Sequence, residues 1–200
     1  MNSQRQSPIY RSRMLQPADE RSPDTHPLTW RLRDDGQVVG LEEYESKEGY
    51  QAVSQVLNGR DPGAVIAAMK EANVRGRGGA GFSAGLKWSL TLQGNDIPRG
   101  YIVCNADEME PGTFKDRLLM EQQPHLLIEG MILAAFANNA RYGYIFLRGE
   151  YVESARVLTA ALAEAREAGW LGPDVAGSGF DFDIALHTGA GRYICGEETA

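Results

Sequence analysis

Apolar residues recur along the chain with two spacings, and each spacing predicts a kind of element. In one long stretch every third or fourth residue is apolar, which predicts a helix closed by Gly169, with one face made of Val152, Ala155, Leu158, Leu162 and Ala165. Apolar and polar residues alternate from Phe180 to His187, which predicts a half-buried strand. Two continuous apolar runs predict further strands: Tyr101–Cys104, interpreted as buried and parallel, and Tyr142–Leu147.

Five other segments are predicted to be helical. Asp61 can cap the second of them, and Pro62 suits its first helical position. The segments are Tyr50–Leu57, Pro62–Asn73, Ser83–Leu92, Lys115–Glu121 and Pro124–Asn138. From His26 to Tyr44 the chain is predicted to be extended, because Trp30 and Leu32 alternate with arginines.

Strands that alternate with long helical segments predict an α/β fold, a Rossmann-like parallel sheet with flanking helices. This domain occupies residues 61–200 and is predicted to be incomplete at its C-terminus, because the chain stops two residues after a glycine- and acid-rich motif. Residues 25–60 are predicted to form an extended arm and a short helix. Residues 1–24 are polar, lack periodicity and are predicted to be disordered, and the arginines before Met14 leave open a transit peptide or an upstream start codon.

Composition and charge narrow the class of protein. The 200 residues are 42% hydrophobic and 24% charged, as in an ordinary soluble domain, and the net charge of −7 disfavours binding to nucleic acid or anionic membranes. The apolar run Leu126–Ala137 is short and contains Glu129, so it is predicted to be a buried helix. No secretory signal is present, and Cys104 and Cys195 are isolated, which predicts reduced, core-filling thiols in a cytosolic protein and no cysteine cluster for a metal.

The segment Val74–Trp88 is rich in glycine and carries three cations. Gly76, Gly78 and Gly81 have the G-x-G-x-x-G spacing of a dinucleotide fingerprint. That fingerprint requires a preceding strand, whereas a helix is predicted here, so this is not the first loop of an ordinary Rossmann unit. Two interpretations stay open, a glycine-rich surface loop and a nucleotide- or flavin-phosphate loop of another lineage that the N-terminus of the next helix faces.

Two further loops follow predicted strands, residues 105–113 and 188–198. Ligands of α/β proteins bind at the carboxyl ends of strands. Together with the glycine-rich segment, these two loops contain cations and a surplus of acids. The cations are Arg75, Arg77, Lys87 and Arg192, and the acids are Asp107, Glu108, Glu110, Glu197 and Glu198. Carboxylates accept hydrogen bonds from ribose hydroxyls and from flavin or nicotinamide N–H groups, although each acid alone could be a solvated surface charge. No nucleophile–histidine arrangement is apparent, so redox chemistry by a bound cofactor fits better than hydrolysis.

Three motifs in this order, Arg75–Trp88, Cys104–Arg117 and Thr188–Glu198, resemble the FMN- and NADH-binding flavoprotein subunit of bacterial NADH:quinone oxidoreductase, respiratory complex I. The resemblance extends from about Thr25 to Ala200, and the segment Thr25–Asp35 is similar to the enterobacterial type.

The resemblance implies a set of cofactor contacts. FMN would be held by the glycine loop, lined by the second loop and closed by the third, through Gly76, Arg77, Gly78, Gly79, Gly81, Lys87, Asn105, Asp107, Glu108, Tyr193, Gly196, Glu197 and Glu198. NADH would stack over the flavin and contact Phe82, Glu110 and Glu198. Hydride would pass directly between the cofactors, so no side chain is implied as acid or base.

The resemblance also implies partners and alternatives. The family's chain continues beyond this one and there carries the cysteine ligands of a [4Fe–4S] cluster, so residues 1–200 alone are expected to bind FMN weakly or not at all. Partners would be the other peripheral-arm subunits, especially a small [2Fe–2S] thioredoxin-like subunit, on the cytoplasmic side of the inner membrane without insertion into it. One alternative is the diaphorase subunit of a soluble NAD-linked hydrogenase or formate dehydrogenase. A remote alternative is an RNA-binding module built on Arg75–Gly79, which the negative charge disfavours.

Overall fold

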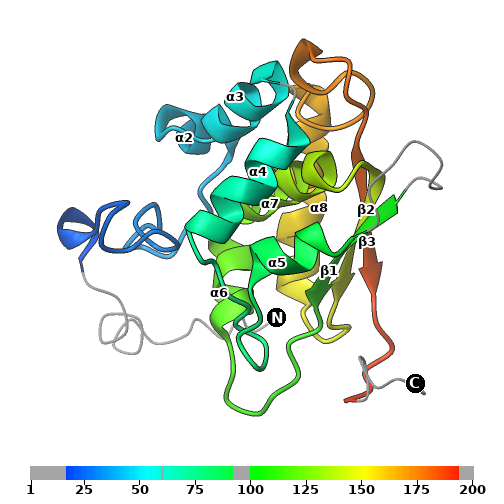
Figure 1. Cartoon of the computed structure of the whole chain (residues 1–200). Coiled ribbons are helices and arrows are strands. Elements are labelled where there is room, and N and C mark those ends of the chain that lie inside the picture. The colour runs from blue at the N-terminus through cyan, green and yellow to red at the C-terminus, as the bar shows by residue number, and fades with distance from the viewer. Residues whose placement is uncertain (1–16, 60, 92–99, 194–200) are drawn as a thin grey trace.

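The computed structural model describes residues 17–59, 61–91 and 100–193 (Figure 1). In chain order its elements are η1 Ala18–Glu20, α2 Leu41–Ser46, α3 Gln51–Gly59, α4 Pro62–Glu71, α5 Ala84–Ser89, β1 Gly100–Ala106, α6 Lys115–Gln122, α7 Pro124–Ala137, β2 Ala140–Leu147, α8 Val152–Glu167, η2 Val175–Gly177 and β3 Asp183–Thr188. The three strands and the six helices predicted from the sequence are present. The largest boundary differences are at α5, which has six residues where ten were predicted, and at the start of β3, which begins at Asp183 instead of Phe180.

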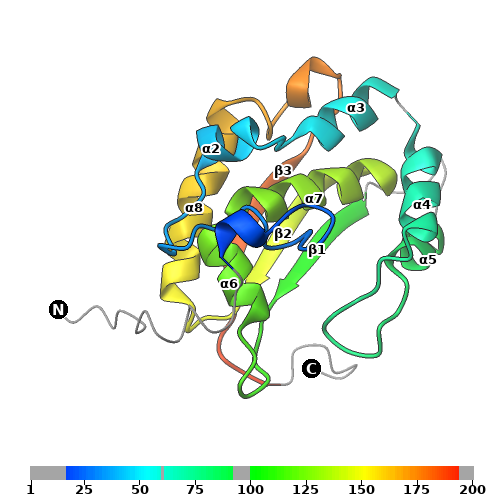
Figure 2. The same cartoon turned by 90° about the vertical axis from the view of Figure 1, so that its left-hand side faces the viewer.

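A parallel sheet in the order β1-β2-β3 forms the centre of the fold, which confirms the predicted α/β class. The register pairs Ala106 with Leu147 and Leu147 with Thr188, so the carboxyl ends of all three strands lie at one edge. Helices α6 and α7 connect β1 to β2, and α8 connects β2 to β3. Figure 2 shows α7 and α8 side by side in front of the sheet.

The core lies between this sheet and the helices. Ile145 and Ile184 on the strands are buried against Ile128 and Ile132 of α7 and Leu158 of α8. Alternate strand residues point to the opposite face, where Tyr101 and Val103 are largely exposed. The prediction that Tyr101–Cys104 is a buried strand is therefore wrong for one of its two faces. An apolar run is typical of strands buried on both sides, but here the connecting helices lie on one side.

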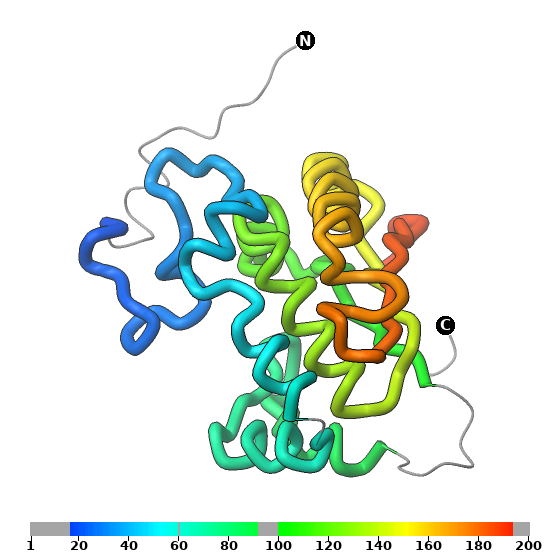
Figure 3. Tube along the Cα trace, turned by 90° about the horizontal axis from the view of Figure 1, so that it is seen from above, coloured from blue at the N-terminus to red at the C-terminus, as the bar shows by residue number. Residues whose placement is uncertain are grey.

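The arm differs from the extended conformation predicted for His26–Tyr44. Turns fold it, with the Trp30 N–H donating to the carbonyl of His26 and the Leu32 N–H to that of Thr29. Residues 41–46 form α2, whose first turn contains Glu42 and Glu43, and acids in the first turn favour a helix. Figure 3 shows the arm, in blue, and β3, in red, on opposite sides of α7.

A buried network of polar side chains attaches the arm to the core. The Tyr44 hydroxyl donates to the Glu129 carboxylate of α7. The Tyr50 hydroxyl lies 3.0 Å from His125 Nδ1, and His125 Nε2 lies 3.0 Å from Glu164 Oε2 of α8. A neutral imidazole makes both contacts, because its Nδ1 can accept a hydrogen bond from the Tyr50 hydroxyl while its Nε2–H donates one to the Glu164 carboxylate. Burial lowers the pKa of His125 below its ordinary value, against the opposing effect of Glu164.

The lowered pKa of His125 predicts a pH-dependent stability. Because the folded state favours neutral His125, the contribution of this residue is fully present above its unfolded-state pKa of about 6.5 and is lost as the pH falls below that value. His125→Gln, whose amide can replace both hydrogen bonds, should remove this dependence. Urea unfolding of both proteins between pH 5 and 8 measures it. An unchanged slope of unfolding free energy in His125→Gln would show that other groups cause the dependence.

Candidate functional site

The glycine loop is a closed loop on the surface. Arg75 and Ser83 form an isolated antiparallel bridge at its base, where the Gly76 N–H donates to the carbonyl of Phe82 over 2.9 Å. The Ser83 hydroxyl then accepts from the Leu86 N–H over 3.3 Å and caps α5. The helix whose N-terminus was predicted to face the ligand is thus shorter than predicted, with six residues.

The backbone does not require most of the glycines in this loop. A Cβ atom at Gly78 or Gly79 would have no neighbour within 4 Å, and one at Gly76 would meet only the Phe82 carbonyl at 3.8 Å. Of these loop positions only Gly81 has a positive φ, at 71°. The open space beside Gly78 and Gly79 is what close approach of a ligand to the backbone requires.

Gly85 has a different role, because it brings α5 against α4. A Cβ atom there would lie 2.5 Å from the Lys70 nitrogen and 2.7 Å from the Met69 carbonyl carbon. Real Cβ atoms do not approach backbone so closely, so the crossing of the two helices depends on this glycine. The crossing holds both ends of the glycine loop.

Gly85→Ala is therefore expected to destabilise the α4–α5 crossing. Overpacking of this kind costs roughly 1–3 kcal/mol of unfolding free energy. The matched control is Gly130→Ala on the exposed side of α7, where a Cβ meets nothing and the exchange should add about 0.5–1 kcal/mol. Urea unfolding followed by circular dichroism measures both. Equal effects of the two exchanges would show that the crossing tolerates the extra atom.

The second loop begins with a tight turn at the end of β1. The Asp107 N–H donates to Asn105 Oδ1 over 3.0 Å, and this bond shapes the turn. Asp107 Oδ1 is buried and has no hydrogen-bond partner in the described part of the chain. A buried carboxylate oxygen without a donor is costly, so this atom is suited to accept a hydrogen bond from a ligand.

The side chain of Glu108 turns inward, toward α6 and Tyr151. Its carboxylate accepts from the Asp116 N–H over 2.7 Å, the Arg117 N–H over 3.3 Å and the Tyr151 hydroxyl over 3.1 Å. Its side chain is only 2% exposed. Glu108 therefore caps α6 and ties the second loop to α8, so the structure places it behind the loop and not on its open side.

Arg148 and Tyr151 complete this arrangement, and the sequence prediction did not include them. Arg148 Nη1 donates to the Glu108 carbonyl over 2.9 Å, and the Arg148 N–H donates to the Ala106 carbonyl over 3.1 Å. Burial, followed by the charge of Glu108, raises the pKa of Tyr151, so its hydroxyl remains a donor. Their position just after β2, at the carboxyl edge of the sheet, was the available signal.

The third loop contacts the second. Its start also contacts the segment that follows β2, since a Cβ at Gly149 would lie 2.4 Å from the Gly189 carbonyl oxygen. Farther along, the Tyr193 hydroxyl donates to the Glu110 carboxylate, and this bond raises the pKa of Tyr193. Two side chains 83 positions apart that were both predicted to face cofactors are thus brought together.

The glycine loop lies at the same end of the molecule as the other two loops in two perpendicular views (Figures 1 and 2). Within the described ranges, no hydrogen bond joins it to either of them. Its cations Arg77 and Lys87 and the ring of Phe82 are exposed, so they are available to a ligand.

The predicted site residues Gly196, Glu197 and Glu198 and the thiol of Cys195 lie outside the described residues. Cys104 is a half-buried free thiol whose pKa burial raises to about 11.

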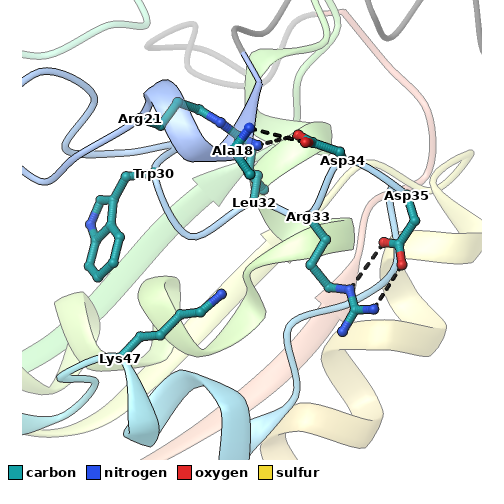
Figure 4. A pocket seen from close by; sticks show the side chains of 8 residues that line it. All are labelled: Ala18, Arg21, Trp30, Leu32, Arg33, Asp34, Asp35 and Lys47. Atoms are coloured by element: carbon teal, nitrogen blue, oxygen red, sulfur yellow. Dashed lines mark hydrogen bonds and ion pairs between the residues drawn. The ribbon is translucent and has the colours of Figure 1, made fainter.

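A separate pocket of about 560 Å³ lies in the arm (Figure 4). Its cations are already paired: Arg21 with Asp34, Arg33 with Asp35 and Glu43, and Lys47 with Glu43. It is lined by Ala18, Arg21, Trp30, Leu32, Arg33, Asp34, Asp35 and Lys47. The cations of this pocket are therefore neutralised by neighbouring carboxylates, and the pocket contains none of the predicted site residues. In the described ranges no helix is long and apolar enough to cross a membrane, and no cluster of acids, histidines and cysteines could hold a metal ion.

Comparison with known proteins shows the family to which this chain belongs. Residues 69–200, which include all three loops, match the family model of the Nuo51 FMN-binding domain. The chain belongs to this family. The resemblance inferred from the three motifs is therefore confirmed.

Relatives of this Nuo51-family chain include the F subunits of the NADH-quinone oxidoreductases of Salmonella typhimurium and of Escherichia coli K12. Each is 62% identical over 180 residues, which is 90% of this chain and 40% of the relative. The chain thus spans 40% of the length of these proteins.

Solved structures of an NAD⁺-reducing [NiFe]-hydrogenase are also similar. The H₂-reduced state matches 90% of this chain and 30% of the hydrogenase chain, with a TM-score of 0.62 and 36% identity. The air-oxidized state matches 69% of this chain and 22% of the hydrogenase chain, with a TM-score of 0.55 and 45% identity.

Proposed function

We propose that this chain is the FMN-binding part of an NADH-oxidising flavoprotein subunit of NADH:quinone oxidoreductase. The observation that carries the proposal is the family match over residues 69–200, since it contains all three loops at one end of the fold. We also propose a division of the chain into an N-terminal extension (1–24), an arm (25–60) and a cofactor domain (61–200).

The residues present fit FMN. Open space beside Gly78 and Gly79 suits close approach of a phosphate and ribityl chain, and Arg77 and Lys87 supply positive charge. The unpartnered Asp107 Oδ1 suits an N–H or hydroxyl donor of the flavin. Glu108 fits as a positioning residue, because its carboxylate is committed to α6 and Tyr151.

FMN, when bound, would accept hydride from NADH and release single electrons to an iron–sulfur cluster. The chain's own residues would bind the two cofactors and orient them toward each other. Phe82, which is 54% exposed, is suited to stack on the adenine of NADH. Glu110, which accepts a hydrogen bond from the Tyr193 hydroxyl, is proposed to contact NADH. The other side of the flavin is proposed to be closed by Gly196, Glu197 and Glu198. Glu198 is also proposed to contact NADH.

The assignments that concern the whole protein are also proposals. The longer protein would carry a [4Fe–4S] cluster and bind the small [2Fe–2S] subunit within the peripheral arm on the cytoplasmic side of the membrane. The hydrogenase structures favour a second candidate, the diaphorase subunit of a soluble NAD-linked enzyme. Copurification with membrane-bound quinone-reductase subunits, or with a soluble hydrogenase, distinguishes the two.

The test uses an extended chain, in which residues 1–200 are continued by the part of the Escherichia coli relative that follows its aligned region. This extended chain is expected to purify with about one FMN per chain, as the family match implies, and NADH should bleach the flavin absorbance. Residues 1–200 alone should retain little flavin. An extended chain that folds but neither carries nor takes up FMN contradicts the proposal.

Glu110→Gln in the extended chain should weaken NADH binding and leave FMN content unchanged. Loss of a charged hydrogen-bond acceptor costs about 1.5–3 kcal/mol, so the Kd for NADH should rise about tenfold or more. Stopped-flow reduction of the flavin at several NADH concentrations measures it, with Glu153→Gln on the exposed face of α8 as control. If the variant instead loses flavin, Glu110 belongs to the FMN site.

A further inference from the structure

The segment between β2 and α8, residues 147–150, contains none of the residues that the sequence prediction assigned to a cofactor. It nevertheless contacts both of the loops at the carboxyl edge of the sheet. Both of its ends are fixed, because Leu147 is the last residue of β2 and the N–H of Tyr151, which precedes α8, donates to the Arg148 carbonyl over 3.0 Å. We call residues 147–150 the spacer segment.

On one side the spacer segment holds the second loop through Arg148. The backbone N–H of Arg148 donates to the Ala106 carbonyl over 3.1 Å, and its Nη1 donates to the Glu108 carbonyl over 2.9 Å. These two carbonyls flank Asp107, whose buried Oδ1 has no partner among the described residues. Because both neighbours of Asp107 are bound to one arginine, Arg148 fixes the backbone of Asp107 relative to β2.

On the other side the spacer segment sets how near the third loop can come. The Gly189 N–H donates to the Leu147 carbonyl over 2.8 Å, and a Cβ at Gly149 would lie 2.4 Å from the Gly189 carbonyl oxygen. Glu150 lies beside the same loop, since a Cβ at Gly191 would be 3.5 Å from Glu150 Oε1. The backbone of the third loop therefore packs directly on the spacer segment, at a distance that requires a residue without a side chain at position 149.

We propose that Arg148 and Gly149 are positioning residues for hydride transfer, because they set the separation between the second and third loops. The inference rests on the proposed function, in which FMN and NADH both contact residues of these two loops. The separation of the loops then determines how closely the two cofactor rings approach. Reacting atoms must lie about 3–3.5 Å apart, and a displacement of about 1 Å can lower a rate about 100-fold.

Gly149→Ala in the extended chain tests the spacing. The new methyl group cannot lie 2.4 Å from a backbone oxygen, so the third loop must move away while Arg148 keeps the second loop in place. FMN should still bind, because each loop keeps its own ligand-facing residues. The rate constant of flavin reduction at saturating NADH, measured by stopped flow, should fall about 100-fold, and the Kd for NADH should change much less.

Arg148→Met tests the contact with the second loop. It removes the donor to the Glu108 carbonyl and should lower the same rate constant about tenfold, and Arg148→Lys, which keeps a donor, should restore part of the loss. Gly130→Ala is the matched control for Gly149→Ala, because its methyl group meets nothing within 4 Å, and the rate constant should not change. Ile132→Val, at a fully buried residue of α7, shows what a loss of stability alone does.

Three results would overturn the proposal. Flavin reduction in Gly149→Ala as fast as in the unchanged extended chain would show that the spacing of the loops does not control the reaction. An equal decrease in Ile132→Val would assign the effect to stability. Should Gly149→Ala fail to fold, an unchanged rate constant in Arg148→Met would be decisive.

Hydrogen exchange separates this proposal from the proposed function. An unchanged extended chain that binds no FMN contradicts the proposed function, but the contact of the third loop with the spacer segment can still be measured. The Gly189 N–H should exchange about 100-fold faster in Gly149→Ala than in Gly130→Ala, because the displaced loop loses its bond to the Leu147 carbonyl. Equal exchange rates would show that position 149 does not set the place of the third loop.

Discussion

Gly78→Val in the extended chain is expected to abolish FMN retention without loss of stability. A side chain at Gly78 meets no protein atom within 4 Å of its Cβ, and φ at this position is not positive, so the fold has room for valine. The same space is where the flavin phosphate chain is proposed to approach the backbone. Filling it should weaken FMN binding about 100-fold or more, which corresponds to ~2.7 kcal/mol.

The measurement for Gly78→Val has two parts. Flavin content after gel filtration and titration with FMN report binding, and urea unfolding reports stability, which should change by less than about 0.5 kcal/mol, as is usual for surface sites. Gly130→Val, the same exchange on the exposed side of α7, is the control and should leave FMN binding unchanged. Full FMN occupancy in Gly78→Val would show that the glycine loop is only a surface loop.

Glu108→Ala is expected to have the largest effect on stability among the acids of the second loop. It removes the acceptor of the Asp116 and Arg117 N–H groups and of the Tyr151 hydroxyl. Loss of a cap together with unsatisfied buried donors should cost about 2–4 kcal/mol of unfolding free energy. Glu108→Gln keeps one acceptor and the shape of the side chain, and should cost less.

Glu110→Ala provides the control for Glu108→Ala, because it removes a carboxylate two residues away in the same loop that is exposed. Its unfolding free energy should change by less than about 0.5 kcal/mol. Urea unfolding of the three variants measures these differences. Equal small effects for Glu108→Ala and Glu110→Ala would return Glu108 to the group of residues that face the ligand.

The contrast between these two acids shows what sequence reasoning could reach in the site. The motif predicted that Asp107, Glu108 and Glu110 lie at the carboxyl end of a strand, and they do. It could not predict that Glu108 turns back to cap α6, because the Asp116 N–H and the Tyr151 hydroxyl that bind it come from other elements. Contacts between positions distant in the chain depend on packing, which local spacing does not record.

The sequence by itself determined the three strands, the helices from α3 to α8 and the family of this protein. Hydrophobic periodicity is local. The apolar residues at every third or fourth position from Val152 to Ala165 were enough to indicate a helix, the alternation from Phe180 to His187 indicated a strand, and the succession of such elements indicated a parallel α/β sheet. The tertiary structure alone decided which side of each strand is buried. Tyr101 and Val103 lie in an apolar run that predicted burial on both faces, but the handedness of the crossovers places α7 and α8 on one face and leaves these two residues on the other.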